Sequence, residues 1–348
     1  MKKSLHKILY IVLLLLVFIP ASIASYLLFS SFSNDSETHY VYIDDDDSVD
    51  SVYTKLSAFA NPRSMKVLQT LNRYGRYAGH IRTGRYVIAD GDGTWKVYRK
   101  LKNGLQDPVK LTIPSVRTTD RLAAEVAKKM MIDSTELLRA LSDEAVCRKL
   151  GFDTTTVICL FVPNTYEVFW NLSTDKFLER MKKEYDLFWN EERKGLADRL
   201  KLIPTEVMTL ASIIDEETAN DAEKPMIAGM YYNRLMFRDE EYPEGMPLQA
   251  DPTVKFALKQ FQLKRIYNDM LHFKSPYNTY INTGLPPGPI RIASVAGIDA
   301  VLHMVKHDYL YMCAKEDFSG THRFARTYQE HLANAVRYAA ALNQRGIK

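Results

Sequence analysis

The sequence predicts an α+β protein that begins with a transmembrane helix and continues into a small and then a larger α+β domain. A charge-free apolar run near the N-terminus, short strand-like segments in the first third and helical periodicity further on support this prediction. A chain of 348 residues with 46% hydrophobic content can bury a sizeable core, and its length favours about two or three folding units. The expected parts are an N-terminal tail and anchor over residues 1–30, a polar linker over 31–39, a small domain over 40–114, a helical connecting region over 115–200 and a larger domain over 201–348.

Residues 8–29 form the expected transmembrane segment. At about 1.5 Å per residue, this run is long enough to cross a hydrocarbon core of roughly 30 Å. Lys2, Lys3 and Lys7 precede it, so the N-terminus is expected in the cytoplasm and the remaining chain across the membrane. A cleavable signal peptide is the alternative, because residues 21–24 (ASIA) resemble a cleavage site, although the apolar run continues beyond them.

The small domain is expected to combine strands and helices. Residues 40–43 alternate like a strand and are followed by four aspartates at 44–47. The aspartates lack the spacing of a calcium loop, so they are interpreted as a solvated turn before a helix capped by Ser48. Further segments that fit strands, or strands alternating with a helix, are residues 84–88, 95–101 and 109–113.

The connecting region has a helical pattern. Residues 115–150 are expected to form two short helices, the first capped by Thr119 or Asp120. A run with the composition of a buried segment follows at 157–162, and residues 173–202 are interpreted as one long amphipathic helix with a solvated charged face.

Residues 205–220 (TEVMTLASIIDEETAN) place acids at the end of a helix that is otherwise built to be buried. The apolar stripe of this helix consists of Val207, Leu210, Ala211 and Ile214. At about 100° per residue, Glu217 falls at the edge of the stripe, Glu216 points the opposite way and Asp215 lies on the other flank. Half-burial would raise the pKa of Glu217, as a general acid near neutral pH requires. On periodicity alone, the alternative is that all these acids are solvated helix decoration.

The charge and the cysteines exclude several function classes. A net charge of +4, spread along the chain, gives no reason to expect a nucleic-acid partner, whereas peptidoglycan and anionic membranes stay allowed. Cys147, Cys159 and Cys313 suit neither a disulfide framework nor a zinc site and are interpreted as small buried apolar residues, with a single disulfide left open. No cofactor and no metal ion is predicted.

Several motifs follow the acidic helix. They are Asn233-Arg234-Leu235, residues 248–254 (LQADPTV), 277–280 (YNTY), 284–290 (GLPPGPI), 309–311 (YLY), 320–324 (GTHRF) and His331. In order and approximate spacing, this series resembles the endolytic murein transglycosylase family (MltG/YceG-like), strongly after Thr205 and weakly from about Tyr40 onward. The resemblance implies that residues 40–114 form a LysM-like domain that binds or orients glycan strands and that residues 201–348 form the catalytic transglycosylase domain.

The resemblance also implies a mechanism. Glu217 aligns with the catalytic glutamate of the family, which would protonate the leaving oxygen of the β-1,4 bond between MurNAc and GlcNAc. As a carboxylate it would then take the proton of the attacking C6 hydroxyl, so that a 1,6-anhydro-MurNAc end forms without water. The side chains expected to bind substrate are Gln249 and Asp251, which match the polar motif of the family, and Tyr277, Asn278, Thr279 and Tyr280, whose groups suit sugar recognition.

Structural interpretations stay open beside these roles. Asp251 is equally suited to cap a helix, and the tyrosines of 277–280 to pack in a turn. Residues 284–290 are expected to shape a cleft wall. Asn164 stands where the family usually carries an acid, so a charged role is in doubt there, although asparagine can keep a hydrogen bond.

Other side chains near the motifs are expected to support the site or the fold. Arg234 is expected to pair with a carboxylate or to support the fold. His322 and His331 show no metal-ligand spacing and are expected to play supporting roles.

The leading expectation is an enzyme that cuts nascent glycan strands internally. It would sit in the bacterial cytoplasmic (inner) membrane as a single-pass protein with its catalytic part outside the cytoplasm. Expected partners are peptidoglycan strands, the membrane, and peptidoglycan synthases or the division machinery. The alternatives are a non-catalytic peptidoglycan-binding division scaffold and a hydrolytic muramidase.

Overall fold

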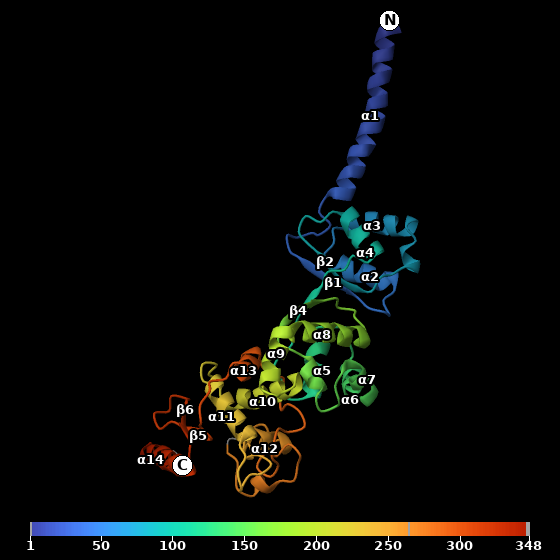
Figure 1. Cartoon of the computed structure of the whole chain (residues 1–348). Helices are drawn as coiled ribbons and strands as arrows, with labels where there is room; N and C mark the ends of the chain where they lie inside the picture. Colours follow the sequence, from blue (N-terminus) through green and yellow to red (C-terminus); the bar gives the residue numbers. More distant parts are fainter. Residues whose placement is uncertain (1, 264, 346–348) are drawn as a thin grey trace. The chain divides into compact units, whose positions relative to one another are not determined.

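The computed structural model describes residues 2–263 and 265–345, which form two compact units (Figure 1). The first unit holds the chain up to Leu111, together with Lys129–Met131 and Tyr166–Ser173. The second holds Thr112–Lys128, Ile132–Thr165 and the chain from Thr174 onward. Helices and short antiparallel sheets occur together, in agreement with the predicted α+β class.

The N-terminal helix is long and apolar. It runs from Lys2 to Phe29 as α1, and its segment His6–Phe29 is long and apolar enough to cross a membrane. The rest of the chain buries none of the apolar stretch of this helix. Its length and composition therefore agree with the predicted anchor.

The remainder of the first unit is a small antiparallel sheet covered by helices. Its elements are β1 (His39–Ile43), α2 (Val49–Ser57), α3 (Pro62–Tyr74), the 3-10 turn η1 (Tyr77–Gly79), β2 (Gly84–Ile88) and α4 (Thr94–Asn103). β1 pairs with β2, with His39 opposite Ile88 and Ile43 opposite Gly84. The core between the sheet and the helices includes Val41, Ile43, Val52, Leu56, Leu68, Tyr86, Val97 and Leu101. β3 (Val109–Thr112) and β4 (Thr165–Val168) form another two-stranded sheet.

Part of the expected linker belongs to this core. Phe32 is fully buried, and the side-chain amide of Asn34 donates to the Ala60 carbonyl at 2.9 Å. Ser48 caps α2 as predicted, accepting a hydrogen bond from the Ser51 backbone N–H at 3.1 Å. For residues 95–101 the sequence left strand and helix as alternatives; they lie in helix α4.

The second unit contains most of the helices. They are α5 (Thr119–Ala127), α6 (Ser134–Ser142), α7 (Glu144–Leu150), α8 (Thr174–Phe188), α9 (Glu191–Arg199), α10 (Pro204–Glu217), α11 (Lys224–Met236), α12 (Asp251–Ala257), α13 (Val295–Leu302) and α14 (Tyr328–Gln344), with 3-10 turns η2 (Val157–Leu160) and η3 (Met270–His272). An antiparallel hairpin of β5 (Tyr311–Ala314) and β6 (His322–Ala325) packs against α14.

Two helix predictions in the connecting region were wrong because polar caps start additional helices. Residues 115–150 were predicted to form two helices but form α5, α6 and α7. Asp133 and Asp143 each accept hydrogen bonds from N–H groups in the first turn of a helix, and the cap at Asp143 separates α6 from α7. The predicted long helix over 173–202 is α8 and α9, with Asn190 capping α9. The N-cap residue of α5 is Thr118, one position before the predicted cap.

Helix α10 lies at the centre of the second unit, where it packs against α9, α11, α12 and α13. The predicted stripe is fully buried, with Val207, Leu210, Ala211 and Ile214 each 0% exposed. Thr209, Ser212 and Ile213 are buried too, so the covered face is wider than the stripe. Because neighbouring helices cover α10, its C-terminal end, which carries Glu217, lies within the second unit.

Candidate functional site

A cavity of about 330 Å³ opens at the C-terminal end of α10. Its polar lining consists of Glu217 from α10, Tyr231 and Arg234 from α11, Gln249 and Asp251 at the start of α12, Tyr280, and His322 and His331 from β6 and α14. Met230, Leu248 and residues 312–314 of β5 form the rest of the wall. The sequence-predicted acid thus shares one hollow with side chains from distant parts of the chain.

Glu217 is half-buried in this cavity. Its Oε1 accepts a hydrogen bond of 2.6 Å from the hydroxyl of Tyr231, which is only 2% exposed. Burial is the main reason that the pKa of Glu217 is raised, and the charge of Asp251 adds to it, while the Tyr231 hydrogen bond, His322 and Lys255 act in the opposite direction. A carboxyl group in this setting stays protonated to higher pH than a solvated glutamate.

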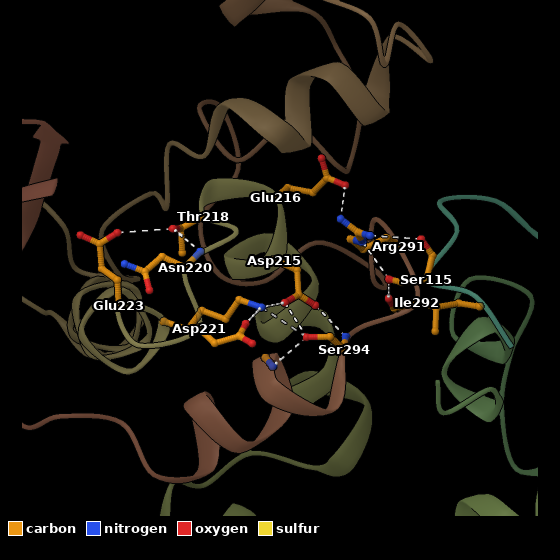
Figure 2. A network of polar contacts seen from close by, with 12 residues as sticks. Ser115, Asp215, Glu216, Thr218, Asn220, Asp221, Glu223, Arg291, Ile292 and Ser294 are labelled. Atoms are coloured by element: carbon orange, nitrogen blue, oxygen red, sulfur yellow. Dashed lines mark hydrogen bonds and ion pairs between the residues drawn. The ribbon is translucent and has the colours of Figure 1, made fainter. Parts of the chain in front are cut away.

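Asp215, in the same acidic run, has a structural role. Its side chain is 4% exposed and pairs with Lys224 Nζ at 2.7 Å. It also accepts hydrogen bonds from the Ser294 backbone N–H at 2.6 Å and the Ser294 hydroxyl at 2.7 Å, as Figure 2 shows. These contacts tie α10 to the start of α11 and of α13.

Glu216 is likewise neutralised by cations. It forms a bidentate pair with Arg117, at 2.9 and 2.7 Å, and accepts a third bond from Arg291 at 3.0 Å (Figure 2 draws the Arg291 side). Glu217, in contrast, has no ion pair among the residues that the structure describes. The alternative of solvated helix decoration is therefore wrong for Asp215 and Glu216, and Glu217 is the acid of the run left to exchange a proton.

The loop before α12 brings Gln249 and Asp251 to the cavity as expected. Gln249 has a left-handed backbone, with φ of 52°, and its N–H donates to the Thr279 carbonyl at 3.0 Å. This conformation is costly for a residue other than glycine and is held by the neighbouring segment. Asp251 is the first residue of α12, after the N-cap residue Ala250, and it accepts from the Tyr280 hydroxyl at 2.6 Å.

The rest of the 277–280 motif lies outside this cavity. Asn278 is fully buried and donates to the carbonyls of Leu271 and Phe273, each at 2.9 Å. Thr279 is 1% exposed and bonds to the Ala250 N–H at 3.0 Å. Tyr277 packs against Phe256, with ring centroids 4.8 Å apart, and lines another hollow beside Arg117. Of this motif, Tyr280 alone lines the cavity with Glu217.

Arg234 supports the wall of the cavity instead of pairing with an acid. Its guanidinium donates to the Leu248 carbonyl at 2.7 Å and also bonds to the Leu310 carbonyl. It has no carboxylate partner in the part of the chain that the structure describes. The run 284–290 also lies elsewhere: Gly284, Leu285, Pro286 and Pro287 line a different cavity of about 800 Å³ near the N-terminal end of α10.

Sequence reasoning missed Tyr231 and did not place His322 and His331 in the lining of the cavity. Tyr231 precedes the Asn233-Arg234 motif on the same helix, but nothing in a single sequence shows that its hydroxyl reaches Glu217. Both histidines line the cavity. His331 Nδ1 is buried without a hydrogen-bond partner within the described part of the chain.

The three cysteines are free. Cys147 and Cys159 are buried, as interpreted from the sequence, whereas Cys313 is partly exposed and borders the cavity. Asn164 is exposed, and its side-chain oxygen accepts the N–H of the next residue at 2.7 Å, so the asparagine keeps a local hydrogen bond.

Comparisons with known proteins agree with one another. The model of the YceG-like family matches residues 41–337. An endolytic murein transglycosylase of Bacillus subtilis is 30% identical over 301 residues, which is 81% of this chain and 80% of that protein. One of Streptococcus pneumoniae is 26% identical over 76% of this chain, which spans about half (52%) of that longer protein. The crystal structure of a YceG-like protein from Listeria monocytogenes superposes with a TM-score of 0.54 and 27% identity, covering 86% of this chain and 99% of that one.

Proposed function

The chain belongs to the YceG-like family of endolytic murein transglycosylases, and on that premise we propose that it cuts peptidoglycan glycan strands with Glu217 as acid and base. The enzyme class is that of a lytic transglycosylase, the activity named for its curated relatives. The observation that carries the residue assignment is the state of Glu217: half-buried, with a raised pKa, bonded to Tyr231 and facing a cavity, while its neighbouring acids are ion-paired.

In the first step Glu217 acts as the general acid. The Tyr231 hydroxyl occupies Oε1, so the proton of the neutral carboxyl group is carried on Oε2. Transfer of that proton to the glycosidic oxygen breaks the C1–O4 bond between MurNAc and GlcNAc and leaves positive charge at C1 of MurNAc. Burial favours the protonated form that this step needs.

In the second step the carboxylate acts as the base. The C6 hydroxyl of the same MurNAc attacks C1, and its proton passes to Glu217, which is thereby restored for the next cycle. The C1–O6 bond closes a 1,6-anhydro ring, and no water enters the reaction. One acid is sufficient because the substrate supplies its own nucleophile.

The cavity rim is proposed to bind the sugars. Gln249, Asp251 and Tyr280 offer amide, carboxylate and hydroxyl groups beside Glu217, which suit sugar hydroxyls and N-acetyl groups. Asn278 and Thr279 are proposed to hold this rim in place, because their side chains are buried and bonded to its loops. Tyr277 is proposed to contact the glycan strand farther along, in the hollow beside Arg117.

We further propose that α1 anchors the enzyme in the cytoplasmic membrane with both units outside the cytoplasm. The length, composition and preceding lysines of α1 support this placement. Tethering would restrict cleavage to strands emerging near the membrane, where peptidoglycan synthases and the division machinery act. The sheet and helices over residues 40–114 are proposed to serve as the LysM-like domain that orients the glycan.

Hydrolysis is the second candidate function, because Asp251 places another carboxylate in the cavity of Glu217. Glycoside hydrolases usually use two carboxylates for catalysis. Mass spectrometry of products from purified uncrosslinked glycan strands separates the two functions. We expect anhydro ends, which are lighter by one water; fully hydrated ends would establish hydrolysis instead. Absence of any cleavage by the folded protein would favour the non-catalytic scaffold.

A further inference from the structure

A buried hydrogen-bonded pair joins β6 to Glu223, the residue directly before α11. Glu223, which is 8% exposed, accepts the backbone N–H of His322 at 2.6 Å with Oε1. Its Oε2 accepts a hydrogen bond from Nδ1 of the same histidine at 3.1 Å. Thr218, directly after Glu217, donates its hydroxyl to Glu223 at 3.4 Å, as Figure 2 shows.

This pairing decides which ring nitrogen of His322 is free. A carboxylate accepts hydrogen bonds, so Nδ1 carries a proton, and in the uncharged form of the ring Nε2 keeps its lone pair. One carbon, Cε1, separates the two nitrogens, so their bonding directions diverge, and Nε2 has no hydrogen bond to any residue that the structure describes. His322 lines the cavity of Glu217, so an oriented acceptor stands beside the acid.

Two other acceptors in the cavity lining each have one partner already. Asp251 accepts from Tyr280 at 2.6 Å, and Gln249 Oε1 lies 3.4 Å from Arg234 Nη1. In the first step Glu217 directs its proton toward the leaving oxygen and accepts from Tyr231 with Oε1, so a separate acceptor can orient the nucleophile without competing with these bonds. The nucleophile nevertheless has to wait close to Glu217, because the same carboxylate later takes its proton.

We propose that Nε2 of His322 accepts a hydrogen bond from the C6 hydroxyl of MurNAc and aims its oxygen at C1, with Glu223 as the positioning residue behind the ring. This role rests on the proposed transglycosylase function. When the C1–O4 bond has broken, O6 bonds to C1 and the hydroxyl proton passes to the Glu217 carboxylate. His322 begins and ends the cycle with its single proton on Nδ1.

Two substitutions of His322 separate this role from a structural one. In His322→Asn the side-chain amide nitrogen lies near the position of Nδ1, so the bond to Glu223 is kept and the acceptor in the cavity is lost. In His322→Gln the amide group reaches the position of Nε2, so an acceptor is restored although the bond to Glu223 is lost. Arg323→Ala is the matched control, because Arg323 lies on the same strand and pairs with Glu316 at the hairpin, outside the cavity lining.

The readouts are kcat and the ratio of hydrated to anhydro ends, measured on the full chain in detergent with thermal melting as a check on folding. His322→Asn should melt like wild type, because the bond to Glu223 is kept. A displaced C6 hydroxyl lets water compete for C1, so kcat should fall by about tenfold or more and the ratio of hydrated to anhydro ends should rise. His322→Gln should recover part of kcat and of the anhydro ends, and Arg323→Ala should keep the wild-type ratio. Glu223→Gln should shift the ratio in the same direction as His322→Asn.

The proposal is overturned if His322→Asn cuts at the wild-type rate with the wild-type ratio, or if His322→Gln is the more impaired of the two. Either result would make the contact with Glu223 the only task of this histidine. Failure of the proposed function is a separate outcome, because it would show as the absence of anhydro ends from the wild-type protein itself.

Discussion

At the residue scale, the acidic run at the end of α10 assigns different tasks to adjacent carboxylates. Asp215 and Glu216 are neutralised by Lys224, Arg117 and Arg291, whereas Glu217 meets a hydroxyl group and a cavity. Side chains that follow each other on a helix point about 100° apart, so neighbours in sequence enter different surroundings. The difference in surroundings, and not the residue type, is what supports Glu217 as the proposed proton donor.

The first prediction concerns Glu217→Gln. The amide keeps the size of the side chain and an acceptor for Tyr231 but has no proton to transfer, so kcat should fall by about a hundredfold to ten-thousandfold. Release of products from defined glycan strands measures the loss, and thermal melting should match that of wild type. An active variant that melts normally would show that another group is the acid.

The second prediction concerns Tyr231→Phe and the pH profile of kcat/KM. The proposed mechanism needs protonated Glu217, so kcat/KM should fall as pH rises through the pKa of this group. The Tyr231 hydrogen bond lowers that pKa, and its removal should move the alkaline limb of the profile to higher pH. Because the acid is then less well oriented, kcat at the optimum should drop roughly tenfold. An unshifted limb would contradict the role of Tyr231.

The third prediction links the pKa of Glu217 to stability. The pKa of Glu217 is higher in the folded protein than in the unfolded chain. The contribution of Glu217 to the free energy of unfolding is therefore complete at pH values below the unfolded-state pKa, and it is lost as pH rises through the folded-state pKa. The free energy of unfolding of wild type should therefore decrease, relative to Glu217→Gln, from about pH 4.3 upward to the raised pKa. Urea titrations at several pH values measure both proteins, and parallel curves would argue against the raised pKa.

At the element scale, α10 is held by polar bonds at the end that carries the catalytic candidate. Asp215 and Lys224 are both buried, with side chains 4% and 7% exposed, and join α10 to α11. Ser294, the N-cap of α13, bonds to the same carboxylate. The direction of Glu217 therefore depends on contacts that do not touch the cavity.

The fourth prediction follows for Asp215→Ala. The substitution removes the main buried partner of Lys224 and leaves the Ser294 N–H unsatisfied, so unfolding should become easier by about 3–5 kcal/mol. Denaturant unfolding measures the change, and replacing the exposed Asp221 by alanine is the matched control, since Asp221 pairs with Lys224 from a side chain that is 68% exposed. Equal stability of the two variants would contradict a structural role for the Asp215 contact.

At the scale of the whole molecule, α1 is proposed to set the place of action and the second unit to carry the chemistry. Phe32 belongs to the core of the first unit, and an added Cβ at Gly93 would lie 2.8 Å from the Leu28 carbonyl oxygen. The last turns of α1 therefore pack against this unit. A truncation that tests the anchor has to keep them.

The fifth prediction concerns a chain that begins at Tyr26. It lacks most of the apolar segment His6–Phe29 but keeps Phe29 and Phe32, so it should fold, leave the membrane fraction and still cut isolated glycan strands. Fractionation of cells and assays on purified strands measure these properties. Continued association with the membrane would show that another surface of the protein binds it.

Sequence patterns predicted elements well where one local signal dominates. The apolar N-terminal helix, the Ser48 cap and the buried stripe of α10 are each set by neighbouring residues and are found as expected. The helix over 173–202 was mispredicted because its charged periodicity hides the break at Asn190, whose capping bond competes with continuation. The pairings of β1 with β2 and of β3 with β4 join segments far apart in the chain and did not follow from one sequence.

The sequence by itself determined that the chain has an apolar N-terminal segment, a buried helix ending in acids and the ordered motifs of a known family. Only the tertiary structure decided that Arg117 and Arg291 neutralise Glu216, that Tyr231 meets Glu217, and that Tyr280 lines the cavity while Asn278 is buried beneath its rim. Periodicity gives the direction of a side chain about the axis of its own helix. The partner it meets there depends on how the other elements pack around that axis.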